Sequence, residues 1–491
     1  MKNLKILSLL ALGLVLPAIV NAQEKTAATY KEQYRPQIHF SPKQHWINDP
    51  NGMVYFNHTY HLFYQYYPKA SVWGPMHWGH AMSTDLIHWK EQPIALYPDS
   101  LGYIFSGSAV VDSNNTSGFG KKGKIPLVAI FTHHDPKGEK AGTDKFQNQS
   151  LAYSLDNGNT WTKYKGNPVL RNPGIKDFRD PKVMWYAKEK KWLMTLATKD
   201  HITFYSAPDL KNWKRESEFG LETGAHGGVW ECPDLFPLKV DGKTYWVLIV
   251  NINPGGPNGG SATQYFVGQF NGSKFTPVDT KTRWLDYGPD EYAGIIWGNT
   301  GPRKIFLGWM SNWEYANQVP TEKWRNAMTI PRVLSLKKVN GELLLASVPV
   351  GELKIISLAP QTAATAKLSA QSVLKKITES LDDYTITLSN DLGEELLIGY
   401  DKKANQYYID RTKAGKVDFQ KDFKGRFVAP RYARTKTSDL TLVIDGTSVE
   451  LFADGGLTTM TAIFFPNKPF DRITTKGIGL QQTALKSIWE K

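Results

Sequence analysis

Short runs of apolar residues, alternating with polar ones, recur along most of the sequence and restrict its fold more than any other feature. Turns rich in Asn-Gly, Asp-Gly and Pro separate these runs, and long stretches with helical periodicity are scarce. Alternation with a period of two, interrupted by such turns, is the pattern of β-strands joined by tight connections. The sequence therefore predicts an all-β protein. The clearest runs are residues 53–56, 60–67, 127–132, 192–198, 244–250 and 304–310.

A degenerate repeat subdivides the first two thirds of the chain. Residues 83–89, 154–161 and 206–213 each follow an apolar run, contain Ser and Asp, and end in Trp. A unit of about 50–70 residues with several strands has the size of one β-propeller blade and its loops. Two further sets of strands start near Trp230 and Asp286. We therefore expect a five-bladed β-propeller between about residues 35 and 345.

The composition changes after about residue 345, where Trp nearly disappears and only Trp489 follows Trp324. Strands in this part alternate cleanly and are separated by turns such as Asp445-Gly446. This pattern favours a β-sandwich. We expect a propeller domain over residues 23–345 and a C-terminal β-sandwich over residues 346–491.

The first 22 residues have the features of a signal peptide. Lys2 and Lys5 precede an apolar run over residues 6–20, and Val20-Asn21-Ala22 ends in small residues suited to cleavage. No later run approaches the roughly 20 apolar residues that span a bilayer. The single cysteine, Cys232, lies far from the cleavage site and allows neither a lipid anchor there nor an internal disulfide. We expect a periplasmic or secreted protein without a membrane anchor.

The chain carries a formal net charge of +13, which raises the question of nucleic-acid binding. Its lysines are scattered, however, so we interpret the charge as a solvated basic surface and expect no nucleic-acid partner.

We interpret His133-His134-Asp135 as a loop and not as a metal site, and expect neither a metal nor a cofactor. The oligomeric state is left open.

Three acidic residues stand beside Pro or Trp at the starts of the first, third and fourth predicted blades. They are Asp49 in Trp46–Gly52, Asp180 in Phe178-Arg179-Asp180-Pro181, and Glu231 in Trp230-Glu231-Cys232-Pro233. The first strands of propeller blades surround one central channel, so these side chains are expected to converge. Glycoside cleavage needs two carboxyl groups, of which the acid must keep its proton through burial or a nearby negative charge. A third carboxylate, steadied by the adjacent arginine, suits sugar hydroxyl groups.

These motifs resemble the three signature motifs of glycoside hydrolase family 32, which contains invertases, inulinases and levanases. The resemblance covers nearly the whole mature chain and is closest to bacterial exo-acting fructan β-fructosidases. It implies a five-bladed β-propeller followed by a C-terminal β-sandwich, and retaining hydrolysis of β-fructosides. Further similarity lies in residues 78–81, 105–108, 309–313 and 452–456.

Carried over by position, the resemblance implies that Asp49 is the nucleophile and Glu231 the general acid and then base. Asp180 is implied to stabilise the transition state by binding fructose hydroxyl groups. Cys232 is expected to be buried beside Glu231 without reacting. The implied pocket for the terminal fructose consists of Asn48, Gln65, Trp73, Phe105, Ser106, Arg179 and Trp313.

The expected reaction is release of terminal fructose from levan-type or inulin-type fructans and from sucrose. Trp73 and residues 132–149 are expected to wall the pocket, which favours an exo mode over an endo-acting levanase or inulinase with an open cleft. A fructosyltransferase uses the same intermediate and differs in excluding water. A non-catalytic fructan-binding propeller is the alternative from another class, and the presence of all three carboxyl groups disfavours it. Inverting or metal-dependent five-bladed enzymes lack the Trp46–Gly52 run.

A retaining mechanism predicts the anomer of the first product. The fructose released should have the configuration of the bond that was cleaved, because two successive displacements restore it. Proton NMR during the first turnovers, before mutarotation, measures this anomer. Initial appearance of the opposite anomer would contradict the predicted nucleophilic role of Asp49.

Overall fold

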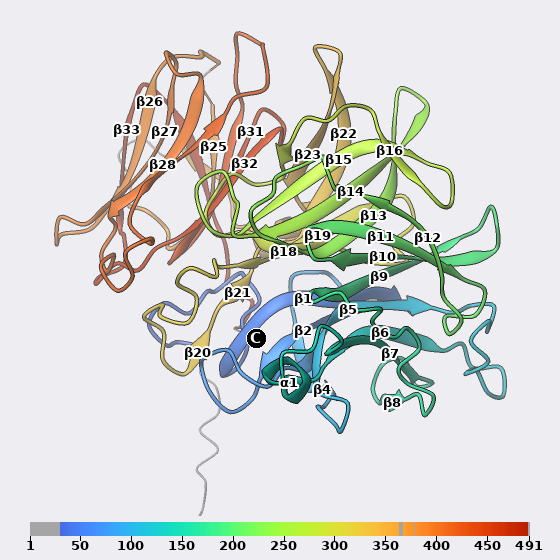
Figure 1. The fold of residues 1–491 in the computed structure, drawn as a ribbon. Coiled ribbons are helices and arrows are strands. Elements are labelled where there is room, and N and C mark those ends of the chain that lie inside the picture. Colours follow the sequence, from blue (N-terminus) through green and yellow to red (C-terminus); the bar gives the residue numbers. More distant parts are fainter. Residues whose placement is uncertain (1–29, 363–366, 378, 490–491) are drawn as a thin grey trace, which may run out of the picture.

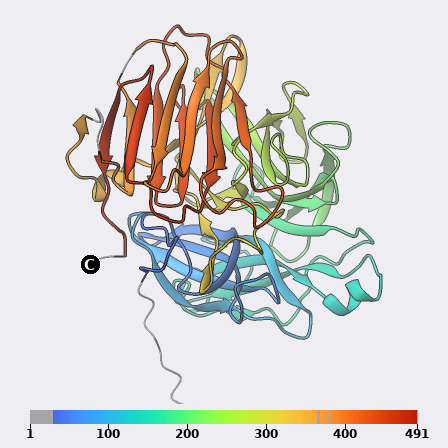
Figure 2. The ribbon, with the colours of Figure 1, turned by 90° about the vertical axis from the view of Figure 1, so that its left-hand side faces the viewer.

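The computed structural model describes residues 30–362, 367–377 and 379–489, so the predicted signal peptide lies outside the described residues. Nearly all of the regular structure is strand. Within these residues the helices are α1 (Pro136–Lys140) and the 3-10 helix η1 (Gly351–Ile356). A ring of five antiparallel sheets stands beside two further sheets, drawn in orange and red in Figures 1 and 2. This confirms the predicted all-β fold, a five-bladed β-propeller followed by a C-terminal β-sandwich. None of the helices described is long and apolar enough to cross a membrane.

The propeller blades follow one another along the chain. Blade 1 contains β1 (His45–Phe56), β2 (Thr59–Tyr67), β3 (His77–Ser83), β4 (Lys90–Leu96) and, parallel to β1, β20 (Trp324–Arg325). Blade 2 contains β5 (Tyr103–Val111), β6 (Leu127–His134), β7 (Gln147–Ser154) and β8 (Thr162–Lys163). Blade 3 contains β9 (Phe178–Tyr186), β10 (Lys191–Thr198), β11 (His201–Ala207) and β12 (Lys214–Phe219).

Two more blades complete the ring, and the sandwich follows. Blade 4 contains β13 (Val229–Val240), β14 (Lys243–Asn253), β15 (Ala262–Phe270), β16 (Phe275–Pro277) and β17 (Arg283–Trp284). Blade 5 contains β18 (Tyr292–Ile296), β19 (Lys304–Met310), β21 (Ala327–Met328), β22 (Arg332–Val339) and β23 (Glu342–Pro349). One sandwich sheet contains β24 (Gln361–Thr362), β34 (Leu480–Ala484), β25 (Gln371–Lys376), β30 (Leu440–Asp445), β31 (Ser448–Ala453) and β32 (Thr458–Ile463). The other contains β29 (Arg426–Pro430), β28 (Gln406–Lys413), β27 (Glu395–Asp401), β26 (Tyr384–Ser389) and β33 (Arg472–Lys476).

The repeat seen in the sequence connects the third and fourth strands of the first three blades. In each copy an aspartate accepts hydrogen bonds from backbone N–H groups that follow it, and so closes the turn. Asp85 Oδ1 accepts from Ile87 and His88, and Asp209 Oδ1 accepts from Lys211 and Asn212. The terminal Trp of each copy directly precedes the outermost strand. The repeat therefore marks equivalent places in successive blades.

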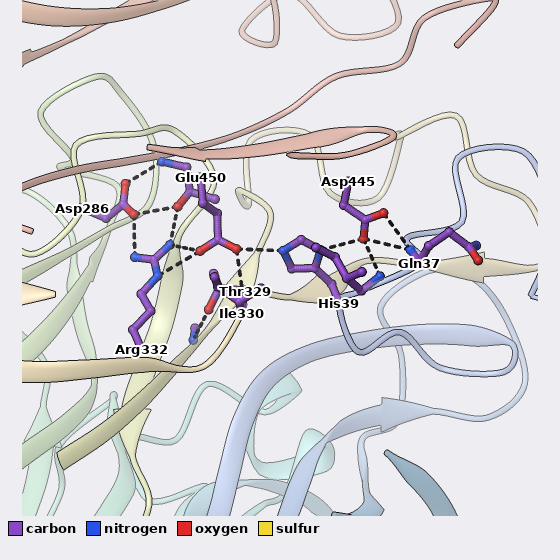
Figure 3. Close-up of polar contacts among 11 residues, drawn as sticks. Gln37, His39, Asp286, Thr329, Ile330, Arg332, Asp445 and Glu450 are labelled. Carbon is purple, nitrogen blue, oxygen red and sulfur yellow. Dashed lines mark hydrogen bonds and ion pairs between the residues drawn. The ribbon is translucent and has the colours of Figure 1, made fainter. Parts of the chain in front are cut away.

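A buried network of charges joins the sandwich to the propeller (Figure 3). Arg332 of blade 5 lies between Asp286, at 2.8 Å, and Glu450 of the sandwich, at 2.5 Å. His39 lies between Glu450 and Asp445, at 2.8 Å from each. Burial disfavours the imidazolium, but its hydrogen bonds to the two carboxylates outweigh this and raise the pKa of His39 to about 9. His39 is therefore positively charged at neutral pH, and each buried charge has an opposite partner.

Backbone contacts reinforce this junction. The N–H of Tyr287 donates to Thr459 O at 2.8 Å, and that of Asp290 donates to Thr461 O at 3.2 Å. Between them Gly288 approaches β32 so closely that a Cβ atom would lie 2.0 Å from Thr461 O. The segment that leads into blade 5 is thus held directly against the sandwich.

Removing one charge from this network should destabilise the whole protein. In Glu450→Gln, Arg332 and His39 lose the carboxylate they share inside the protein, and breaking a buried ion pair costs about 3–5 kcal/mol. Urea unfolding monitored by tryptophan fluorescence measures the loss. Glu395→Gln, which removes the exposed partner of Lys413, is the matched control and should cost less than about 1 kcal/mol. Equal losses in the two variants would show that the network contributes no more than a surface ion pair.

Candidate active site

The innermost strand of every blade leaves its regular register at the same level of the ring. The shifts lie between Ile47 and Pro50 in β1, and at the corresponding places in the four other strands. A β-bulge bends a strand and re-aims its side chains, and bulges are common beside active sites. Three of the five shifts lie at Asp49, Asp180 and Glu231. In the four other inner strands the register shifts lie at residues 104–107 in β5, 179–182 in β9, 231–234 in β13 and 292–295 in β18.

These bulges surround a pocket of about 280 Å³. It brings together all ten residues that the sequence analysis placed in the site. Eight of them lie on inner or second strands of blades 1 to 4, Trp73 lies in the loop between β2 and β3, and Trp313 lies in the connection that follows β19 of blade 5. The pocket lining is Asn48, Asp49, Gln65, Trp73, Met76, Phe105, Ser106, His134, Glu139, Phe146, Gln147, Asp177, Arg179, Asp180, Glu231 and Trp313.

Asp49 has a hydrogen-bond donor on each carboxyl oxygen. Asn48 Nδ2 donates to Oδ1 at 2.8 Å, and Ser106 Oγ donates to Oδ2 at 2.6 Å. Trp46 Nε1 in turn donates to Asn48 Oδ1 at 2.7 Å, which fixes the orientation of the amide. Burial and the charge of Glu231 raise the pKa of Asp49 above its ordinary value, while the two donors oppose that rise. The donors hold the carboxylate in one orientation.

Asp180 is held in an unusual backbone conformation with φ of 64°, a region that few residues other than glycine adopt. Its Oδ2 accepts a hydrogen bond from the backbone N–H of Cys232 at 3.0 Å. Burial, with the charges of Glu231 and Asp49, raises the pKa of Asp180 to about 7 against the opposing charge of Arg179.

Cys232 is buried, and its Sγ lies 3.5 Å from Asp49 Oδ2. Burial also raises the pKa of this thiol well above its ordinary value, so it stays protonated and unreactive.

Glu231 is oriented from two sides. Arg179 donates to Oε1 through Nε at 3.1 Å and through Nη2 at 2.9 Å, and the hydroxyl of Tyr292 donates to Oε2. Arg179 also pairs with Asp177. Its guanidinium therefore links the Asp177 carboxylate to that of Glu231.

Aromatic and amide groups line the remaining surface. Trp313 stacks on Trp46 with ring centroids 5.8 Å apart, and Trp73 meets Phe105 edge-on at 6.3 Å. Gln65 is almost fully buried, yet its amide nitrogen has no hydrogen-bond partner among the described residues. A buried donor without a partner is costly, so this amide suits a bound hydroxyl group.

Seven residues of the site were not named from the sequence. Tyr292 contacts Glu231, and six others line the pocket, four of them within residues 132–149, where a wall was expected. The interpretation of His133 and His134 as loop residues was wrong, because both belong to β6. The described part of the chain contains no group of three or more His, Cys, Asp or Glu that could hold a metal ion. The six lining residues are Met76, His134, Glu139, Phe146, Gln147 and Asp177.

A second pocket, of about 300 Å³, involves later residues of the same inner strands. Its charged groups are Lys182, Lys304 and Asp234, and Lys182 pairs with Asp234 at 2.9 Å. With a single carboxyl group it cannot supply the pair that glycoside cleavage requires. This second pocket therefore lacks the groups for glycoside cleavage, which the pocket around Asp49 provides.

Comparison with known proteins agrees with this geometry. The model of the glycosyl hydrolases family 32 N-terminal domain matches residues 39–347, and that of the family 32 C-terminal domain matches residues 339–488. The chain belongs to glycosyl hydrolases family 32. A levanase of Bacillus subtilis is 44% identical over 98% of this chain and 73% of its own length. An extracellular exo-inulinase of Aspergillus niger is 41% identical over 90% of this chain and 91% of its own.

Solved structures of the family superpose over almost the whole molecule. The exo-inulinase of Aspergillus awamori has a TM-score of 0.86 and 38% identity, covering 94% of this chain and 100% of that one. The β-fructofuranosidase of Schwanniomyces occidentalis, complexed with fructosyl-erythritol, has a TM-score of 0.83 and 32% identity, covering 92% and 98%. Both family 32 domains are therefore present in this chain.

The raised pKa of Asp180 predicts a pH-dependent gain in stability when its charge is removed. Its folded pKa of about 7 exceeds the ordinary 3.8, so the stability it contributes at low pH is lost as pH rises to about 7. Asp180→Asn should therefore raise Tm more at pH 8 than at pH 5, while activity falls. Differential scanning calorimetry at both pH values tests this, with Asp144→Asn on the exposed loop after α1 as control. An equal gain at both pH values would contradict the prediction.

Proposed function

We propose that this family 32 enzyme is an exo-acting, retaining β-fructosidase that releases terminal fructose from fructans and from sucrose. The observation that carries the proposal is the convergence of Asp49, Asp180 and Glu231 from three blades into one pocket. The names of its relatives, a levanase and exo-inulinases, support fructans as the substrate class. Preference among levan, inulin and sucrose is decided by the experiment below.

In the first step, a carboxylate oxygen of Asp49 attacks the anomeric carbon of the terminal fructose while Glu231 protonates the departing oxygen. The glycosidic bond breaks and a covalent fructosyl-enzyme forms. In the second step, Glu231 removes a proton from water, the water attacks the same carbon, and Asp49 leaves. Two inversions return the original configuration.

The neighbouring groups suit Asp49 to its role as nucleophile. The hydrogen bonds from Asn48 and Ser106 favour the ionised form of Asp49, which the attack requires. Asp180 and Arg179 lie beside Glu231 and Asp49 and suit the fructose hydroxyl groups. Hydrogen bonds from fructose hydroxyl groups to the Asp180 carboxylate strengthen as positive charge develops on the sugar ring.

The pocket geometry favours the exo mode. Trp73 and Phe105 stand on one side, and residues of the β6–β7 connection, including Glu139 and Phe146, stand on another. A pocket enclosed in this way accepts the end of a chain and leaves no path for the polymer to continue past it. We further propose that the enzyme works outside the cytoplasm after loss of residues 1–22, with domains over residues 23–345 and 346–491.

A product time course tests this function. The protein is incubated separately with levan, inulin and sucrose, and early products are separated by chromatography. Free fructose should appear first, and Asp49→Ala and Glu231→Ala should release almost none while keeping a native circular dichroism spectrum. Mixed oligosaccharides before fructose would favour the endo-acting alternative, and fructosyl oligomers from sucrose would favour a transferase. Binding without turnover in the unaltered protein would favour a fructan-binding propeller.

A further inference from the structure

The rim of the active-site pocket carries an acidic side chain that the proposed reaction does not use. Glu139 lies on α1, the short helix between β6 and β7, whose first turn is capped by the Asp135 side chain accepting from Lys137 N. The Glu139 side chain is 53% exposed, against 20% for that of Glu231. It therefore lines the pocket nearer to its mouth than Glu231 does.

Glu139 is positioned by a chain of hydrogen bonds that starts at the catalytic groups. Gln147 Oε1 accepts from the Phe178 N–H at 2.8 Å and lies 3.5 Å from Arg179 Nη1. The Gln147 amide nitrogen is 3.3 Å from His134 Nδ1, and His134 Nε2 is 3.1 Å from Glu139 Oε2. Because an amide nitrogen can only donate, Nδ1 is the acceptor and Nε2 carries the proton that it donates to Glu139. Burial lowers the pKa of His134, in keeping with this neutral form.

An aromatic surface accompanies this chain of hydrogen bonds. His134 stacks on Phe105 with ring centroids 4.2 Å apart and an interplanar angle of 11°. Tyr103 is stacked with the same His134 at 6.0 Å, and Trp73 meets Phe105 edge-on. These rings extend from inside the pocket to Tyr103, which is not among its lining residues. Together with Glu139 they provide apolar faces beside a hydrogen-bond acceptor, the combination that suits a sugar ring.

The role of Glu231 indicates on which side of the cleaved bond the leaving sugar lies, and this side adjoins the aromatic surface. Glu231 protonates the oxygen of the departing sugar, so that sugar must lie on the Glu231 side of the bond. The same wall continues from Glu231 through Arg179, Gln147 and His134 to Glu139. Resting on the proposed function, we propose that Glu139 is a specificity-determining residue that accepts hydrogen bonds from hydroxyl groups of the leaving sugar and disfavours anionic leaving groups.

Charge at the mouth supports the second half of this proposal. Glu139 and Asp177 are both acidic, and Arg179 already pairs with Asp177 and Glu231. A phosphorylated leaving sugar therefore meets carboxylate repulsion without an unshared cation in the lining, while neutral hydroxyl groups find an acceptor.

Steady-state kinetics of Glu139→Ala and Glu139→Gln test the proposal. The substrates are sucrose, a neutral fructo-oligosaccharide, and sucrose phosphorylated on its glucose unit. Glu139→Ala should raise KM for the neutral oligosaccharide by about tenfold, the effect of one charge-assisted hydrogen bond. Its kcat should stay within about twofold, because the reacting atoms are untouched. Glu139→Gln keeps an acceptor without the charge, so it should raise KM for neutral substrates by only about threefold, since a neutral hydrogen bond has roughly half the strength of a charge-assisted one. It should improve kcat/KM for the phosphorylated substrate by about fivefold.

Two controls separate this role from a structural one. Lys140→Gln alters the same exposed helix and should leave KM for the two neutral substrates unaffected. Inhibition by free fructose reports the terminal-fructose pocket and should be unchanged in every variant. The inference is overturned if fructose inhibition weakens in parallel with KM, or if both Glu139 variants match the unaltered enzyme. Failure of the unaltered enzyme to release fructose from any substrate would instead overturn the proposed function.

Discussion

Five inner strands must meet around one axis, and the active site depends on how each of them accommodates that convergence. Every inner strand changes register at the same level. The backbone at Asp180, Cys232 and Ala293 adopts positive φ there, a conformation costly for residues with a Cβ atom. Without the bulges, these side chains would follow the regular alternation of the sheet. The bulges bend the strands and direct the side chains toward the axis. The pocket is thus a consequence of closing the ring, and its acidic residues occupy places that the closure creates.

Gathering three carboxyl groups in this space opposes folding, and the surroundings compensate only in part. Burial and mutual repulsion raise the pKa of Asp49 and Asp180, and Arg179 is the cation that faces the acidic groups from within the lining. At the junction with the sandwich the balance differs, because Arg332 and His39 are shared among Asp286, Glu450 and Asp445, and each of these five groups has an oppositely charged partner. In the pocket, Arg179 offsets the repulsion among the acidic groups only in part, so the pKa of Asp180 stays raised.

The junction and the pocket are connected through a short segment of blade 5. Asp290 pairs with Arg411 of the sandwich at 2.6 Å and accepts from the Tyr315 hydroxyl. Two residues later, Tyr292 donates its hydroxyl hydrogen bond to Glu231. The sandwich therefore helps to position a group that contacts a proposed catalytic carboxyl, although its own strands contribute no residue to the pocket lining.

The amino-acid sequence alone is enough to recognise the strand alternation, the blade repeat, the change of composition near residue 345 and the three acidic motifs. These features are local: alternation reflects one buried face, and the Asp-closed turns and acid–Pro pairs lie within a few residues. The sequence indicated residues 132–149 as a wall of the pocket, but which of their side chains line it follows from the three-dimensional arrangement alone: they are His134, Glu139, Phe146 and Gln147. Tyr292 and Asp177 had no sequence signal at all, because they lie on other segments of the chain and share no pattern with the acidic motifs. The three-dimensional arrangement also sets the pKa of Asp180, because that pKa depends on burial and on the charges of Asp49 and Glu231. These two residues lie 131 positions before and 51 positions after Asp180 in the chain (180 − 49 and 231 − 180).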